Sequence, residues 1–159
     1  MKKNKKANER SSLMHIGRRV DYAVRALAYL AAQPSNRIVP RMEIEKMQDI
    51  PLHYLSKIMK DLVDHGLVHS QLGAKGGFCL AKPAKDISIK EVYESMEGPL
   101  VLMQCLEKGK NYCLYPSVCT QISVWERVQA LVANFLATIP MSEIADQVGL
   151  RNRPIKLSV

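Results

Sequence analysis

A two-faced helix followed at once by a glycine-rich hairpin, within residues 51–81, is the feature that most limits how this chain can fold. We expect Pro51 at the first helical position and Gly66 as the C-terminal cap. At 100° per residue the helix between them has an apolar side and a polar, partly basic side. The apolar side holds Leu52, Leu55, Met59, Leu62 and Val63, and the polar side holds His53, Ser56, Lys57, Lys60 and Asp64.

A shorter helix is predicted just before it, over residues 40–47, with Met42, Ile44 and Met47 as its apolar positions. Two short helices with a tight connection, the second having a polar outer face, are typical of a helix-turn-helix. On these two helices alone, an ordinary surface helix is the alternative.

Two short strand-like runs follow, over residues 67–72 and 78–81, and residues 73–77 between them predict a hairpin turn. A helix-turn-helix followed by such a hairpin is a winged helix. The turn glycines let backbone amides approach phosphate closely, and Lys75 adds a positive charge there. No Gly-Lys-Ser or Gly-Lys-Thr ending follows, so the glycines are not a nucleotide-hydrolysing P-loop.

The net charge of +8 is concentrated in the first half of the 159 residues. Residues 1–10 contribute +4, residues 15–85 contribute +5, and the remainder from Asp86 contributes −1. An anionic partner such as double-stranded DNA is therefore expected to bind the first half. The basic start is either part of that surface or a flexible, solvated arm.

Three thiols, Cys105, Cys113 and Cys119, lie in one short segment of the near-neutral second half. Glycine, asparagine and proline residues between them predict a loop, which can bring the sulfurs to one point. No apolar run reaches the length of a membrane span, so we expect a cytoplasmic protein with reduced thiols. Clustered thiolates then favour zinc or an iron–sulfur cluster, or a metal-free redox switch, and three of them leave one ligand position to fill.

Four further segments complete the predicted fold. An amphipathic helix covers residues 18–33, and another covers about 88–97, where Ser88 and Glu91 form a capping box. A long helix over residues 121–139 has an apolar stripe wide enough for dimerisation, and a short helix over about 141–148 follows. The stripe holds Ile122, Val124, Trp125, Val128, Leu131, Val132, Phe135 and Leu136.

The predicted fold class is mainly α with a small β-hairpin wing, built as a winged helix-turn-helix domain plus a long C-terminal dimerisation helix. The predicted division is a flexible basic arm (1–12), the DNA-binding domain (13–85), a linking helix with the cysteine loop (86–120), the dimerisation and short C-terminal helices (121–148), and a tail (149–159).

Five features together resemble the Rrf-two family of winged-helix transcription regulators, over roughly residues 16–140. They are residues 18–27, residues 51–55, the wing residues 73–78, residues 89–92 and the three spaced cysteines. The resemblance implies a homodimeric repressor that binds a palindromic operator and holds an iron–sulfur cluster in the cysteine loop. A 4Fe–4S cluster is favoured over 2Fe–2S, and the implied signal is iron, oxygen or redox state, or nitric oxide.

The cluster ligands implied by the resemblance are Cys105, Cys113 and Cys119, whose spacing of seven and then five residues is most like the RirA branch. The IscR-like fourth ligand, a histidine, is absent because Ile122 stands at its position. Asp21, contributed by the other subunit, matches the NsrR-like aspartate. Glu107, Glu126 or water are the alternatives, and Cys79 lies outside the triplet.

The resemblance also implies DNA contacts, on the helix from His53, Tyr54, Ser56 and Lys57 and on the wing from Gln71. We add Lys60, Lys75 and Gly76 as phosphate or base-edge candidates. Ser56 and Leu72 depart from the acidic residue and the arginine of IscR-type readers, so a base preference cannot be transferred.

No enzyme is expected and no small-molecule substrate, because the sequence has no CxxC or HExxH pattern and its histidines are not grouped with a nucleophile. The alternatives to iron–sulfur sensing are a zinc-binding or metal-free thiol-switch regulator, and a winged-helix interaction module that does not bind DNA.

Overall fold

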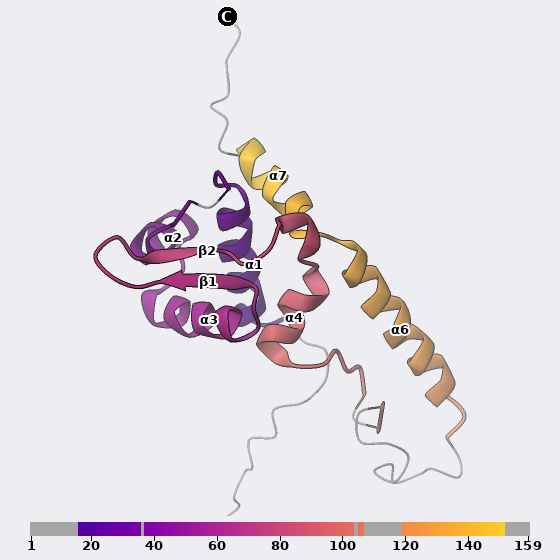
Figure 1. Cartoon of the computed structure of the whole chain (residues 1–159). Coiled ribbons are helices and arrows are strands. Elements are labelled where there is room, and N and C mark those ends of the chain that lie inside the picture. Colours follow the sequence, from indigo (N-terminus) through magenta and orange to yellow (C-terminus); the bar gives the residue numbers. More distant parts are fainter. Residues whose placement is uncertain (1–15, 36, 104, 107–118, 152–159) are drawn as a thin grey trace, which may run out of the picture.

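The structure is a computed structural model that describes residues 16–35, 37–103, 105–106 and 119–151 (Figure 1). The elements are α1 (Arg18–Ala31), α2 (Arg41–Gln48), α3 (Leu52–Asp64), β1 (Val68–Gln71), β2 (Gly77–Leu80), the 3-10 turn η1 (Ala84–Asp86), α4 (Ile89–Glu97), α6 (Ile122–Thr138) and α7 (Met141–Arg151). Six helices and one antiparallel hairpin in these residues confirm the mainly helical winged fold.

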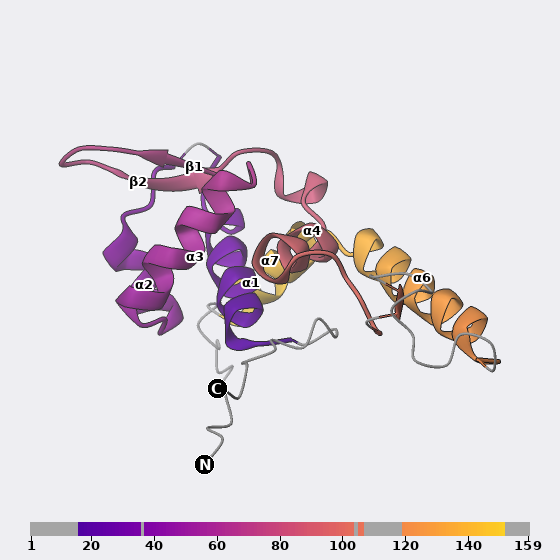
Figure 2. The same ribbon diagram turned by 90° about the horizontal axis from the view of Figure 1, so that it is seen from below.

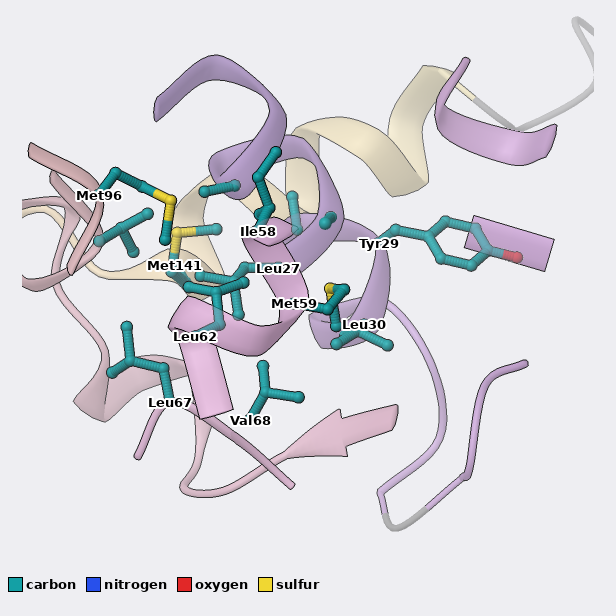
Figure 3. Close-up of a cluster of buried hydrophobic side chains, with 14 of the residues drawn as sticks. Leu27, Tyr29, Leu30, Ile58, Met59, Leu62, Leu67, Val68, Met96 and Met141 are labelled. Carbon is teal, nitrogen blue, oxygen red and sulfur yellow. The ribbon is translucent and has the colours of Figure 1, made fainter. Parts of the chain in front are cut away.

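Helix α1 is the centre of the head of the molecule, meaning α1–α4, α7 and the hairpin. It packs against α2, α3, α4, α7 and β2, and Figure 2 shows these elements gathered around it. Figure 3 shows the core that results, where Leu27 of α1 meets Ile58 and Leu62 of α3. Met141 of α7 is fully buried in the same cluster, so α7 helps to hold α1 and α3 together.

Helix α3 is two-faced as predicted, with Leu55, Met59 and Leu62 fully buried. It begins one residue later than expected, because Pro51 takes the N-cap position with extended backbone. Gly66 has a φ of +69° and ends the helix, as predicted, since glycine adopts that conformation without strain. Leu52, which was placed on the apolar side, is 38% exposed, because the first turn projects beyond the core.

Helix α2 follows its prediction in position but not in burial. Ile44 is fully buried, whereas Met42 and Met47 are 73% and 52% exposed. The helix has only eight residues, and Ile44 is its single fully buried side chain.

The hairpin pairs Val68 with Leu80 and Gln71 with Gly77 in antiparallel register. Its outer strand is joined by a residue far away in sequence, because Val39 and Phe78 exchange two backbone hydrogen bonds of 2.9 Å. The root of the wing is therefore tied to the segment that leads into α2.

The predicted capping box of α4 is confirmed. The Glu91 amide donates to Ser88 Oγ at 3.2 Å, and the Ser88 amide donates to the Glu91 carboxylate at 2.8 Å. Hydrogen bonds from Lys82 and Ser88 outweigh the opposing effect of burial, which is the largest single influence, and lower the pKa of Glu91. A further hydrogen bond joins the start of α4 to the residue after α6, since the Ile89 amide donates to Ile139 O at 2.9 Å.

Helix α6 leaves the head and extends away from it (Figures 1 and 2). Val132 and Leu136 pack against the core, but no residue of α6 is fully buried. Val124, Trp125, Leu131 and Phe135 are exposed, Leu131 at 70% and Phe135 at 63%, so half of the predicted apolar stripe is left uncovered by the described residues. Across the residues described, no helix is long and apolar enough to cross a membrane.

Candidate nucleic-acid interface and metal centre

The outward face of α3 carries the residues predicted to contact DNA. His53, Lys57 and Lys60 are exposed, and Ser56 between them is half-buried. Positions three and four apart share one side of a helix, so these four form one surface. We call His53, Ser56, Lys57 and Lys60 the reading face.

Tyr54 lies at the edge of the reading face and is held by two ring contacts. Its ring centroid is 4.4 Å from that of His53 and 5.9 Å from that of Tyr22, the latter in an edge-on arrangement at 60°. Tyr22 belongs to α1, so an aromatic contact joins the first turn-and-a-half of α1 to the N-terminal end of α3.

The three lysine candidates differ in whether they already form an ion pair within the protein. Lys60 donates to Asp64 one helical turn later, at 2.5 Å, and this hydrogen bond raises the pKa of the Lys60 ammonium. Lys57 and Lys75 form no ion pair with any residue that the structure describes, and both are exposed. Lys57 and Lys75 are therefore the better placed of the three to meet a phosphate.

The wing tip is exposed at Gln71 and Lys75, and Leu72 is 93% exposed. Gly76 lies inside the turn: its amide donates to Gly73 O at 2.9 Å, and a Cβ built on it would lie 2.4 Å from Gln71 O. Its amide is thus already engaged in forming the turn, and glycine is required there for space.

One residue of this surface was missed by the sequence analysis. Arg41, the first residue of α2, donates from Nη1 to Ser56 Oγ at 3.2 Å, so its guanidinium lies over the reading face. The sequence offered no signal for this contact beyond a basic residue in a helical first turn, because the two positions are fifteen residues apart.

A second network fixes α2 to α1. Arg37 donates to both carboxylate oxygens of Glu43 at 2.9 Å each, and Tyr29 Oη donates to the same carboxylate at 2.7 Å. The Tyr29 hydrogen bond, together with Arg37, lowers the pKa of Glu43 against the opposing effect of burial. These hydrogen bonds therefore hold α2 in a fixed position against α1.

The metal-ligand candidates fall in two places. Cys105 and Cys119 are half-buried and free, at the two ends of the loop before α6. Cys113 and Glu107 lie outside the described residues. Asp21 is exposed in the first turn of α1, 3.6 Å from Arg25. Within the part of the chain that is described, no three His, Cys, Asp or Glu side chains are grouped closely enough to hold a metal ion.

The segment that leads into the cysteine loop lies against α6, and the segment that leaves the loop continues into α6. The Leu102 amide donates to Gln129 Oε1 at 2.9 Å, and Leu106 lines one groove together with Glu126 and Gln129. Cys105 stands beside Leu106, and Cys119 is three residues before α6 begins. The donor set suits a soft metal or an iron–sulfur cluster, because sulfur is the ligand that both prefer. Cys79 is on β2, away from this loop.

A helix-turn-helix with a free cationic outer face, followed by a hairpin whose tip is exposed, defines a winged-helix DNA-binding protein. Comparison with known proteins narrows this class. The family model for Rrf2, an iron-dependent transcriptional regulator, matches residues 16–147. The chain is 33% identical over 122 residues to the HTH-type transcriptional regulator NsrR of Oceanobacillus iheyensis, covering 77% of this chain and 82% of that protein.

Two solved structures have the same fold. The global cysteine regulator CymR of B. subtilis matches with a TM-score of 0.71 and 21% identity, over 85% of this chain and 98% of that one. IscR of T. potens matches with a TM-score of 0.65 and 24% identity, over 89% and 93%. The chain belongs to the Rrf2 family, and it is a transcription regulator rather than an enzyme.

Proposed function

We propose that this protein is a homodimeric repressor whose affinity for a palindromic DNA operator is controlled by an iron–sulfur cluster. The signal would be iron supply, oxygen or redox state, or nitric oxide, and the place of action the cytoplasm. The observation that carries the proposal is the pair of free, half-buried thiols, Cys105 and Cys119, on the two sides of the segment before α6, with Leu102 hydrogen-bonded to Gln129 of that helix.

The uncovered face of α6 supports the homodimer. Val124, Leu131 and Phe135 are each more than half exposed, on a helix that extends away from its own head. A second copy of the same helix would cover these side chains, and a two-fold pair of heads reads a palindrome.

Cys105, Cys113 and Cys119 would hold the cluster, with Asp21 of the partner subunit as the fourth ligand. A bound cluster supplies a redox-active and oxygen- or nitric-oxide-sensitive centre. In one chain, Figures 1 and 2 place α1 within the head and α6 extending from it, which favours a ligand from the partner over one from the same chain.

The residues around Asp21 provide a route from that site to DNA. The Asp21 carboxylate pairs with Arg25 at 3.6 Å, and the Arg25 guanidinium lies 5.6 Å from the centroid of the Tyr22 ring. Tyr22 in turn contacts Tyr54 beside the reading face. A change in the partner of Asp21 would free or hold Arg25, and the contact chain would pass this change to the N-terminal end of α3.

Anaerobic native mass spectrometry of the wild type, Asp21→Ala and Cys105→Ser tests the proposal, with Cys79→Ser as the matched control outside the loop. We expect a dimer carrying a cluster in the wild type and control, none in Cys105→Ser, and a less firmly held one in Asp21→Ala. DNA binding to a promoter fragment should change when a chelator removes the cluster. Wild-type protein without cluster mass or visible absorption would overturn the cluster assignment.

A second candidate is a zinc-binding or metal-free thiol switch on the same DNA-binding fold. It is favoured by the same two free thiols, and the structural neighbour CymR is described as a global cysteine regulator. Elemental analysis of anaerobic protein separates the cases: iron with sulfide supports the cluster, zinc supports a structural site, and neither supports a thiol switch.

A further inference from the structure

Arg41 occupies the place on the reading face where α3 itself offers only a short side chain. Its guanidinium nitrogen Nη1 is 3.2 Å from Ser56 Oγ, and Ser56 lies between His53, Lys57 and Lys60 on that face. A side chain from α2 therefore extends across the gap between the helices and ends over the surface that α3 turns toward DNA.

The Ser56 hydroxyl is arranged to accept this contact. It donates its own proton to Leu52 O at 2.9 Å, which leaves its lone pairs to receive the Arg41 N–H. Ser56 thus has no proton left to offer a base, whereas a guanidinium has several N–H donors, of which this contact uses one. The pair works as one unit, in which the serine fixes the arginine.

Arg41 is also not neutralised by the protein. Arg19, Arg25 and Arg37 each pair with a carboxylate, but none of the ion pairs among the described residues includes Arg41. It is exposed, and the only hydrogen bond from its side chain in that part of the chain is the one to Ser56. Its charge and most of its donors are available to a ligand.

The position of the Arg41 guanidinium indicates whether it contacts a base or a phosphate of DNA. In helix-turn-helix docking the N-terminal part of the second helix meets base edges, while the first helix crosses the backbone. Ser56 is in the second turn of α3. Arg41 therefore belongs to the helix that crosses the DNA backbone, but its guanidinium lies beside the helix that meets base edges. Paired N–H donors of arginine match the O6 and N7 acceptors of guanine in the major groove.

We propose that Arg41 reads a guanine in each half-site and that Ser56 is its positioning residue. This inference rests on the DNA-binding part of the proposed function and is independent of the cluster. It assigns a base-reading role to the first helix of the motif, at a position where the base preference of related readers could not be transferred.

In vitro selection from a randomised duplex library tests the assignment, using the full-length chain with and without chelator treatment and continuing with the tighter-binding form. The variants are Arg41→Ala, Arg41→Lys and Ser56→Ala, and Lys46→Ala is the control that removes an exposed charge from the same helix. Circular dichroism before selection verifies the fold of each variant.

The wild type and Lys46→Ala should select a guanine at one position of each half-site and discriminate against its replacement by about 5-fold to 160-fold, the range of one bidentate base contact. Arg41→Ala and Arg41→Lys should lose this preference while the other positions are kept. Ser56→Ala should weaken it, and the Ser56→Ala change should add nothing in an Arg41→Ala background.

Two results would overturn the assignment while leaving DNA binding intact. One is an unchanged motif for Arg41→Ala. The other is an equal loss of affinity on all duplexes with a salt slope reduced by about 1, which marks a phosphate contact. A wild type that enriches no sequence would overturn the inference and the proposed DNA binding together.

Discussion

Replacing Gly77 by alanine should break the tie between the wing and the rest of the head. A Cβ on Gly77 would lie 2.3 Å from Val39 O and 2.6 Å from Val39 C. These are backbone atoms, so no side-chain rotation relieves the contact, and the strand must move away from Val39. The two 2.9 Å hydrogen bonds between Val39 and Phe78 would then be lost. At about 0.5–1.5 kcal/mol each, the unfolding free energy should fall by about 1–3 kcal/mol.

Urea unfolding and amide hydrogen exchange together measure this effect. Gly66→Ala is the matched control, because a Cβ there meets nothing within 4 Å and its cost comes from the φ of +69° alone. Both variants should be less stable than the wild type, but only Gly77→Ala should lose exchange protection selectively at Val39 and Phe78. A Gly77→Ala protein within about 0.5 kcal/mol of the wild type, with both amides still protected, would refute the reasoning.

Three further predictions concern the reading face, the acid stability and the dimer. Lys57→Ala should weaken specific DNA binding and reduce the salt slope by about 1, as measured by titrations at several salt concentrations; unchanged affinity and slope would remove Lys57 from the interface. Glu43→Gln should lower stability at pH 7. The pKa of Glu43 is depressed in the folded state, so its contribution is present above its unfolded value near 4.5 and is lost as the pH falls through the lower folded value. The unfolding free energies of wild type and variant, measured with urea, should therefore converge as the pH falls below 4.5, and a constant difference would contradict the ion-pair account. Leu131→Glu should reduce dimerisation by at least tenfold in analytical ultracentrifugation, since it buries a charge in the apolar face of α6; an unaltered dimer would place the interface elsewhere.

Local signals in the sequence were sufficient for most of the fold. The 3.6-residue periodicity located α1, α3 and α6 within a few residues, and Ser88 with Glu91 identified the cap of α4. These features depend on neighbours three or four positions away, which a sequence displays directly.

Features that depend on distant residues were not accessible in the same way. Met42 is exposed although it was predicted as an apolar position of α2, because a helix of eight residues buries only one side chain, Ile44, in the core. The bridge between Val39 and Phe78, and the burial of Met141 in the head, join residues tens of positions apart.

The candidate site divides along the same line. The sequence supplied the donor types of the metal site and the exposed residues of α3, since residue chemistry and helix faces are local properties. It could not supply the contact of Arg41 with Ser56, which depends on the packing of α2 against α3. The proposed fourth ligand, Asp21 of a second chain, depends on an arrangement of two chains that no pattern within one chain specifies.

The Val39–Phe78 bridge has a consequence for the spacing and base sequence of the operators that this protein would bind. Because the hairpin is hydrogen-bonded to the segment before α2, we expect the wing and the helices to move as one rigid body. In the proposed homodimer, a signal would then shift or tilt the two heads relative to one another without reorienting the wing within either head. The base preference within each half-site should therefore be the same in every signalling state. The two signalling states should instead differ in how their DNA affinity depends on the length of the spacer between the half-sites.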